Sequence, residues 1–421
     1  MALNLFGQTY QQILDQVLGG GKDGKFQLAY PFIDWTWPTP NSGFIDPTAY
    51  TYVGRIPQWS AIGQSYRPTA TDLHSAYLSM LLDCPKLTIP PEKQQQLTEA
   101  DEQITKCLNK TQEDTEARNR AWQIANSDLP PGVPKPEWNE WVVNSGWAST
   151  LQGDKDALAK ASETKQLIVS QENPQYKDAV AAATPPTVQN LKPGYVLCFV
   201  TPGQKEVRPN YLIGQSGSDW IAQLTEGGGM PINIQLSAST SSSALQQSWA
   251  QGVMSGEDYQ FFSIYSENGW KELDIAKEDK TVRVSIKIAA VTQVPIVPDS
   301  EWYKSGYLNI LATKSNWNPP FTTDKVFGKG GLIPLVVTGM VAGYQPSFEI
   351  KMSRETFQQH KSEFTTCDGI RIGPFQFGGS GRTSSDSWTH SVSSSTFSGK
   401  STAKYPFIMG FLVSEPVTTK V

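Results

Sequence analysis

The stretch Val282-Arg283-Val284-Ser285-Ile286-Lys287-Ile288 alternates apolar with polar residues at every position. Successive side chains of a β-strand point to opposite faces, so this alternation predicts a strand with one buried and one solvated face. Ile232–Leu236 and Phe348–Met352 repeat the pattern. Half-buried strands of this kind are typical of an antiparallel sheet.

The C-terminal part, residues 188–421, contains further strand-like segments. Its short apolar runs are separated by turn signals such as Asn268-Gly269 and Asp368-Gly369. About eleven short strands without long intervening helices predict an antiparallel β-sandwich or barrel-like domain, with one short helix near Arg354–Lys361. The other expected strands are Tyr195–Val200, Tyr211–Gly214, Trp220–Leu224, Tyr259–Tyr265, Tyr307–Ala312, Leu332–Ala342, Ile370–Phe377 and Tyr405–Val413.

Residues 70–187 have a helical pattern instead. Thr71-Asp72 can cap a helix that runs to Leu82 and ends before Pro85. A long helix is expected over residues 92–126, with a sparse inner stripe formed by Leu97, Ile104, Leu108 and Trp122. Shorter helices are expected to begin near Glu137, to cover Asp154–Val169, and to end at Ala183.

The helical segment is acidic. Residues 91–183 hold 15 acidic and 10 basic residues, a balance of −5 that equals the net charge of the whole chain. Three interpretations fit a thin acidic helical domain: an ordinary helical subdomain, an assembly arm, or the mobile helical element of a pore-forming protein.

The N-terminal part, residues 1–69, combines a helix with an aromatic, proline-rich arm. Apolar residues recur at helical spacing over residues 2–20, and Gly19-Gly20-Gly21 ends the pattern. The arm that follows includes Trp35, Trp37 and Trp59. Clustered aromatic side chains can pack over a core, anchor an interface or form a ligand platform.

The fold class predicted from these patterns is α+β. An N-terminal helix and aromatic arm (1–69) and an acidic helical domain (70–187) precede an antiparallel β-domain (188–421).

Two Ser/Thr/Gly-rich tracts, at 237–253 and 378–402, interrupt the β-domain. In the second, 18 of 25 residues are Ser, Thr or Gly. Such a composition cannot bury enough apolar surface to offset its ordering entropy, so an ordered tract must pair into a sheet or against a partner. The large apolar side chains within the tracts, Trp249, Trp388 and Phe397, are candidate binding or interface residues together with Trp35, Trp37 and Trp59.

Charge and hydropathy bear on the partners and the location of the protein. A net charge of −5 without a Lys/Arg cluster disfavours nucleic-acid binding. The first residues lack the basic and apolar regions of a signal peptide, and no apolar run is long enough to span a membrane as a helix. We therefore expect a cytoplasmic product as synthesised, with leaderless release left open.

Motifs for catalysis, metals and cofactors are absent from the sequence. The three histidines, His74, His360 and His390, are far apart, and the four cysteines form no CxxC pair. Gly214-Gln215-Ser216-Gly217-Ser218 lacks the last glycine of a nucleophile elbow, and Gly399-Lys400-Ser401 lacks the first glycine of a phosphate loop. We predict no catalytic residue, no metal site and no cofactor.

The leading hypothesis is therefore a non-enzymatic, self-associating binding or structural protein that acts through β-edges and aromatic contacts, as a homo-oligomer. Low charge removes the repulsion that keeps sheet edges apart. One alternative is a pore-forming, toxin-like protein whose Ser/Thr-rich segments or helical domain rearrange at a membrane. A second alternative is a carbohydrate-binding protein, with a glycan as its partner.

Overall fold

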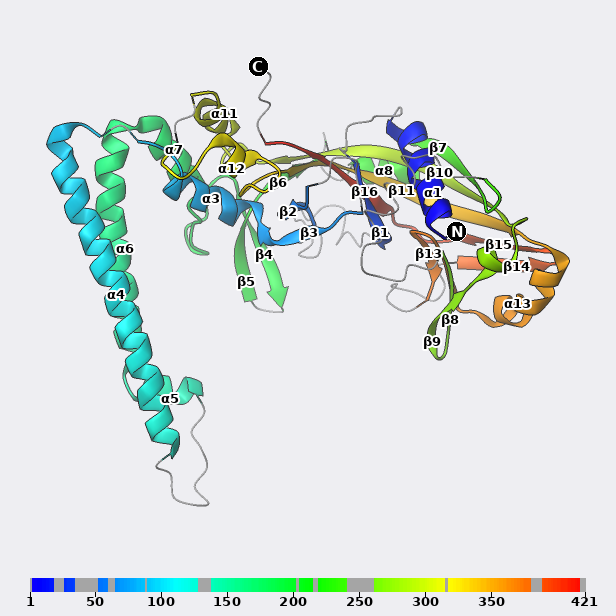
Figure 1. The fold of residues 1–421 in the computed structure, drawn as a ribbon, viewed down its shortest axis with the longest axis horizontal. Coiled ribbons are helices and arrows are strands. Elements are labelled where there is room, and N and C mark those ends of the chain that lie inside the picture. The colour runs from blue at the N-terminus through cyan, green and yellow to red at the C-terminus, as the bar shows by residue number, and fades with distance from the viewer. Residues whose placement is uncertain are drawn as a thin grey trace. The chain divides into compact units, whose positions relative to one another are not determined.

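The computed structural model describes residues 2–18, 26–34, 52–59, 65–87, 89–127, 138–201, 204–214, 219–240, 261–314, 317–379 and 388–416. It is an α+β fold with antiparallel sheets, which confirms the predicted fold class (Figure 1). The chain divides into two compact units: Leu81–Ala181 with Asn316–Asn318 form a helical unit, and the remainder forms a β-unit.

The β-unit is built around two 16-residue strands, β10 (Arg283–Pro298) and β11 (Val336–Lys351). They pair antiparallel from Arg283 opposite Lys351 to Pro295 opposite Gly339. The alternating residues of the predicted strand lie in β10, where Val284, Ile286 and Ile288 are buried, as the pattern requires.

Other strands extend this sheet on both sides. β10 also pairs with β7 (Met230–Ser237) near its start and with β6 (Tyr211–Ile213) near its end. β11 also pairs with β16 (Phe407–Ser414) near its start and with β15 (Thr396–Ser401) near its end. β6 and β7 are the outer strands on the β10 side. On the β11 side the outer strands are β1 (Phe26–Asp34), beside β16, and β14 (Trp388–Ser393), beside β15.

A second sheet has four strands in the order β13-β12-β8-β9. One continuous core joins it to the large sheet, to helix α1 (Ala2–Leu18) and to helix α13 (Arg354–Thr366). The strands are β8 (Phe262–Ser266), β9 (Gly269–Leu273), β12 (Gly369–Ile372) and β13 (Phe375–Gly378).

Small two-stranded sheets and short helices complete the β-unit. β2 (Arg55–Pro57) pairs with β3 (Pro68–Asp72), and β4 (Tyr195–Thr201) pairs with β5 (Gln204–Pro209). The short helices are α8 (Asp219–Thr225), α10 (Ile275–Glu278), α11 (Ser305–Lys314) and α12 (Thr323–Phe327).

Two predicted strands are helices in the structure. Trp220–Leu224 lies in α8, where Trp220 and Leu224, four residues apart, are buried. Tyr307–Ala312 lies in α11, where Leu308, Leu311 and Ala312 are buried. Spacings of three and four residues place side chains on one face of a helix. The spacing of the buried residues therefore indicates a helix, although the apolar composition of these short runs is also compatible with a strand.

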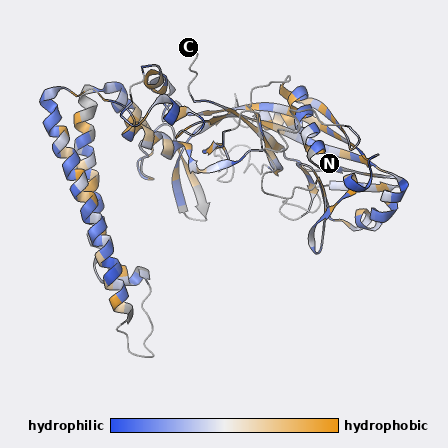
Figure 2. Ribbon diagram, viewed as in Figure 1, coloured by the Kyte–Doolittle hydropathy of each residue, from blue (hydrophilic) through white to orange (hydrophobic). Residues whose placement is uncertain are grey.

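The helical unit centres on two long helices. α4 (Pro91–Ser127) and α6 (Trp147–Glu172) run side by side (Figure 1). Most of α4 is hydrophilic (Figure 2). α5 (Trp138–Asn144) packs on α6. The last residues of α3 (Leu73–Asp83) and most of α7 (Pro174–Ala183) also belong to this unit. Asp72 caps α3 as predicted, because its Oδ1 accepts a hydrogen bond from the Ser75 N–H at 2.8 Å.

The core of the helical pair is small. Within the described part of α4 and α6, the buried side chains are Ala100 and Asp154. Leu108, predicted on the inner stripe, is 51% exposed, whereas Leu97, Ile104 and Trp122 are half-buried. The apolar residues of α4 are too sparse to fix a full inner face, so small side chains meet at the seam instead.

Candidate functional site

The tail tract forms an outer edge of the large sheet. β14 and β15 make an antiparallel hairpin from Trp388 opposite Ser401 to Ser393 opposite Thr396. β15 pairs with β11 on its other side. The described part of the tract thus pairs within its own chain, and among the described strands β14 has a partner on one side only.

Strand β14 is an unusual edge because it carries no charged residue. Trp388 is its only buried side chain, and Thr389, His390 and Ser391 are exposed. Natural edge strands are normally protected from pairing with other chains by Lys residues, Pro residues or bulges. β14 has none of these, and no other described strand pairs with its outer edge.

Trp388 anchors the start of this edge to the core. It is 9% exposed, and its Nε1 donates a hydrogen bond to the Asp368 carbonyl oxygen at 3.1 Å. Its ring stacks on His390, with the ring centroids 4.7 Å apart, and also faces Phe348 at 6.4 Å. These contacts hold Trp388 inside its own chain.

Phe397 lies deeper in the same core. Its side chain is fully buried and stacks on Phe364 at 4.6 Å between centroids. It also packs edge-on against Phe348 at 5.4 Å, so Phe348 contacts both of the predicted residues Trp388 and Phe397. The structure brings these two together as core residues that support the hairpin.

The remaining predicted site residues are not part of this cluster. Trp59 is half-buried, and the Lys329 ammonium lies 4.9 Å from the centre of its ring, a cation–π distance. Trp35, Trp37 and Trp249 lie outside the described residues. A binding or interface role for the six aromatic residues stays a prediction.

The opposite edge of this part of the sheet, β7, is covered by helix α1. Three glutamines of α1 each exchange two hydrogen bonds with one backbone position of β7. The Gln12 amide donates to the Gln235 carbonyl oxygen at 2.6 Å and accepts from the Gln235 N–H at 2.8 Å. Gln16 makes the same pair of bonds with Asn233, and Gln8 with Ser237, at distances of 2.9 to 3.1 Å.

The spacing of the two elements explains this match. A helix rises about 1.5 Å per residue, so glutamines four apart are about 6 Å apart along its axis. Alternate residues of a strand are about 6.6–6.8 Å apart. The amides at positions 8, 12 and 16 therefore fall opposite the outward-facing backbone groups of residues 237, 235 and 233, and replace the strand that would otherwise pair there.

The apolar face of α1 holds the glutamines in place. Leu5, Phe6, Ile13 and Leu14 are buried in the core of the β-unit. We did not predict the glutamine–β7 contacts from the sequence. The signal that could have revealed them is the four-residue spacing of Gln8, Gln12 and Gln16 beside the apolar stripe.

A polar cavity of about 440 Å3 lies elsewhere in the β-unit, beside the start of α3. Its charged lining residues are Arg55, Asp72, Glu206 and Arg208. Glu206 already accepts two hydrogen bonds from Arg208, at 2.7 and 3.0 Å, and Asp72 caps α3. Three of the four charged side chains therefore already have partners within the chain.

His74 also lines this cavity and is held by neutral groups. Burial lowers its pKa, although a hydrogen-bond contact with the Ala183 carbonyl oxygen opposes that shift. Nε2 lies 2.7 Å from this oxygen and 2.9 Å from the Tyr195 hydroxyl oxygen. The carbonyl requires a proton on Nε2, so this nitrogen serves to position the ring rather than to accept a proton.

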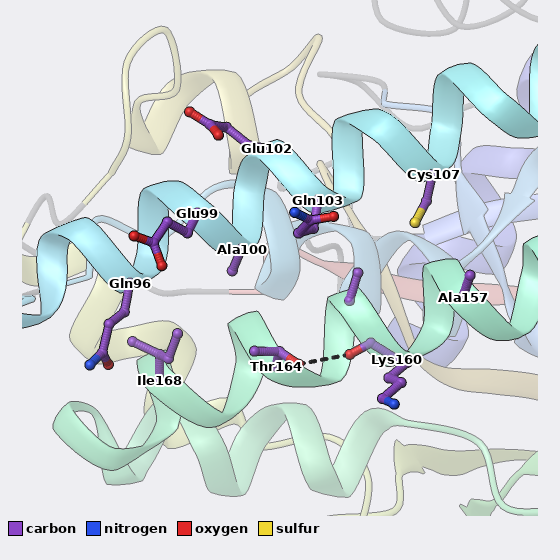
Figure 3. Close-up of a pocket in the computed structure, with 11 residues that line it drawn as sticks. Gln96, Glu99, Ala100, Glu102, Gln103, Cys107, Ala157, Lys160, Thr164 and Ile168 are labelled. Atoms are coloured by element: carbon purple, nitrogen blue, oxygen red, sulfur yellow. Dashed lines mark hydrogen bonds between the residues drawn. The ribbon is translucent and has the colours of Figure 1, made fainter.

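A groove of about 770 Å3 runs between α4 and α6 in the helical unit. Figure 3 shows Ala100 and Cys107 pointing from α4 toward α6, whereas Glu102 points away from it. Small side chains, among them Ala157 and Ala161, line the α6 side. The groove is thus an open part of the seam between the two helices, lined mainly by small side chains on the α6 side.

Comparisons with protein-family models, with curated proteins and with solved structures gave no match. Within the described parts of the chain, no cluster of three His, Cys, Asp or Glu side chains could hold a metal ion. No helix there has the length and apolarity needed to cross a membrane.

Proposed function

We propose that the protein is a non-enzymatic, self-associating structural or binding protein, and that the backbone edge of β14 is its association surface. The carrying observation is the contrast between two uncharged edges of one sheet. β7 is capped by glutamine side chains, whereas β14 has no such cap among the described residues.

Backbone pairing at an open edge supports this function better than aromatic contact does. Added strands gain affinity from main-chain hydrogen bonds, and alternate side chains set the register. The aromatic residues of the tail, Trp388 and Phe397, are occupied in their own core. Their part in the proposed function is to hold the hairpin rigid, so that little ordering entropy is lost when a second strand pairs.

Concentration-dependent association tests this proposal. Sedimentation velocity over a wide concentration range should show a species heavier than the monomer. The fraction of the protein in this species should rise with concentration. The double substitution Ser391→Lys/Ser393→Lys should abolish it, because lysines on an edge oppose strand pairing. Ser391→Thr/Ser393→Thr keeps the edge neutral and should associate like the wild type. A wild-type protein that stays monomeric at the highest concentration would refute the proposal.

A further inference from the structure

We infer that the glutamines of α1 cap the β7 edge against pairing, so that β14 pairs with β14 of a second copy and association stops at a two-fold dimer. This inference rests on the proposed function. It adds that the interface is two-fold and that the glutamine cap on β7 limits association to a dimer.

Two uncharged edges on one sheet create a risk of uncontrolled growth into filaments. If β14 of one copy paired with β7 of the next, the resulting pair would still have one free β14 edge and one free β7 edge, and could go on adding subunits. A contact between two different surfaces that does not close into a ring generates an open filament. Pairing of β14 with β14 uses the same surface twice and closes after two subunits.

The charged edges of the β-unit do not share this hazard. β9 carries Lys271 and Glu272, and β5 carries Lys205, Glu206 and Arg208. Charged side chains on short edge strands oppose association with a neighbour. Among the edge strands of the large sheet, β6 has three residues and β1 carries a proline and Asp34, whereas β7 and β14 are longer than β6 and uncharged. β7 and β14 are therefore the edges of this sheet that most need another form of control.

The contacts between α1 and β7 supply that control. Every second backbone position of β7 from Asn233 to Ser237 exchanges two hydrogen bonds with an α1 glutamine. Asn4 continues the series by donating to the Thr240 carbonyl oxygen. An incoming strand would have to displace these amides, and with them the buried face of α1, before it could pair with β7.

Removing the amides while keeping the helix tests the inference. The variant Gln8→Ala/Gln12→Ala/Gln16→Ala retains the buried stripe of α1. Gln11→Ala is the matched control, because the Gln11 amide bonds to Asp15 on the same helix, at 2.8 Å, and not to β7. Gln12→Glu is a milder second variant in case the triple one folds poorly, since a carboxylate keeps the shape but cannot donate to the Gln235 carbonyl.

Two measurements separate the parts of the inference. Hydrogen exchange should show the Asn233, Gln235 and Ser237 amides exchanging roughly tenfold faster or more in the triple variant, and unchanged in Gln11→Ala. Sedimentation velocity and electron microscopy should show that wild type and Gln11→Ala stop at dimer mass, whereas the triple variant grows into larger, elongated assemblies. Adding Ser391→Lys/Ser393→Lys to it should abolish that growth.

Each contrary result refutes a defined part. Wild-type assemblies that grow beyond the dimer would overturn the closed two-fold interface while leaving self-association intact. A triple variant with fast exchange at β7 that still stops at the dimer would overturn the role of α1 as a cap. A strictly monomeric wild type would overturn the proposed function and the dimer together.

Discussion

The side-chain amide of Gln12 exchanges two hydrogen bonds with the backbone of Gln235, as a residue of a neighbouring strand would. The two residues are 223 positions apart in the chain. A helix thus satisfies the edge of a sheet through side chains placed at its own four-residue period.

Gln12→Ala should lower the free energy of unfolding by about 1–2 kcal/mol, because two hydrogen bonds worth about 0.5–1.5 kcal/mol each are lost. The higher helix propensity of alanine offsets a few tenths of this loss. Chemical denaturation monitored by tryptophan fluorescence measures the change. Gln11→Ala should shift stability by less than about 0.5 kcal/mol. Equal losses in the two variants would show that the contact with β7 adds no stability.

Phe397→Ala should destabilise the β-unit by about 3–5 kcal/mol, the usual cost of truncating a fully buried phenylalanine. Its ring fills the space between Phe364 and Phe348. Thermal and chemical unfolding measure this loss, and Tyr405→Ala, at a side chain that is 58% exposed, provides the control. If Phe397→Ala weakened association without lowering stability, Phe397 would be an interface residue rather than a core residue.

The tail illustrates which parts of the fold a sequence can predict. The alternation in β10 and the apolar stripe of α1 are local patterns, and both elements form where expected. The Ser/Thr/Gly composition of β14 and β15 gives no such local signal. These strands form because β15 pairs with β11, a contact between residues far apart in the chain, and because Phe397 enters the core.

The contacts of the candidate site could be predicted from the sequence even less than the strands of the tail. Trp388 and Phe397 stood out as large apolar residues in a polar tract, but composition cannot separate an exposed anchor from a buried one. The pairing of Gln8, Gln12 and Gln16 with β7 requires the register between a helix and a strand more than 200 residues later. Only the folded chain supplies that register.

Stability should fall as the pH rises through the pKa of His360. His360 Nδ1 lies 2.7 Å from Glu363 and Nε2 lies 3.0 Å from Glu278, on α10. Burial of the imidazole lowers its pKa, but the hydrogen bonds and charges of both carboxylates outweigh burial and raise it above 6.5. Lys271, on β9, also binds Glu363.

The raised pKa of His360 decides how the free energy of unfolding changes with pH. A raised pKa means that the folded protein binds the proton more tightly than the unfolded chain. The stabilisation that protonated His360 gives the folded protein is therefore complete below pH 6.5 and is lost as the pH rises above the raised pKa. Denaturation midpoints measured from pH 6 to pH 9 should therefore fall in the wild type relative to His360→Gln, whose side chain does not titrate. Parallel profiles for the two proteins would contradict a proton-linked role for His360.

Filling the groove between α4 and α6 should stabilise the helical unit. Ala161 lines the groove, and leucine there would bury up to three more carbon groups worth about 0.8 kcal/mol each when fully buried. Because the groove is open to solvent, we expect a gain of about 1 kcal/mol, seen as slower hydrogen exchange in α4 and α6. Ala159→Leu, at an exposed position of α6, has the same helix propensity cost and should leave exchange unchanged. If Ala161→Leu gave no more protection than Ala159→Leu, the seam between the helices would be as well packed as it can be, and the groove would be a feature of the surface.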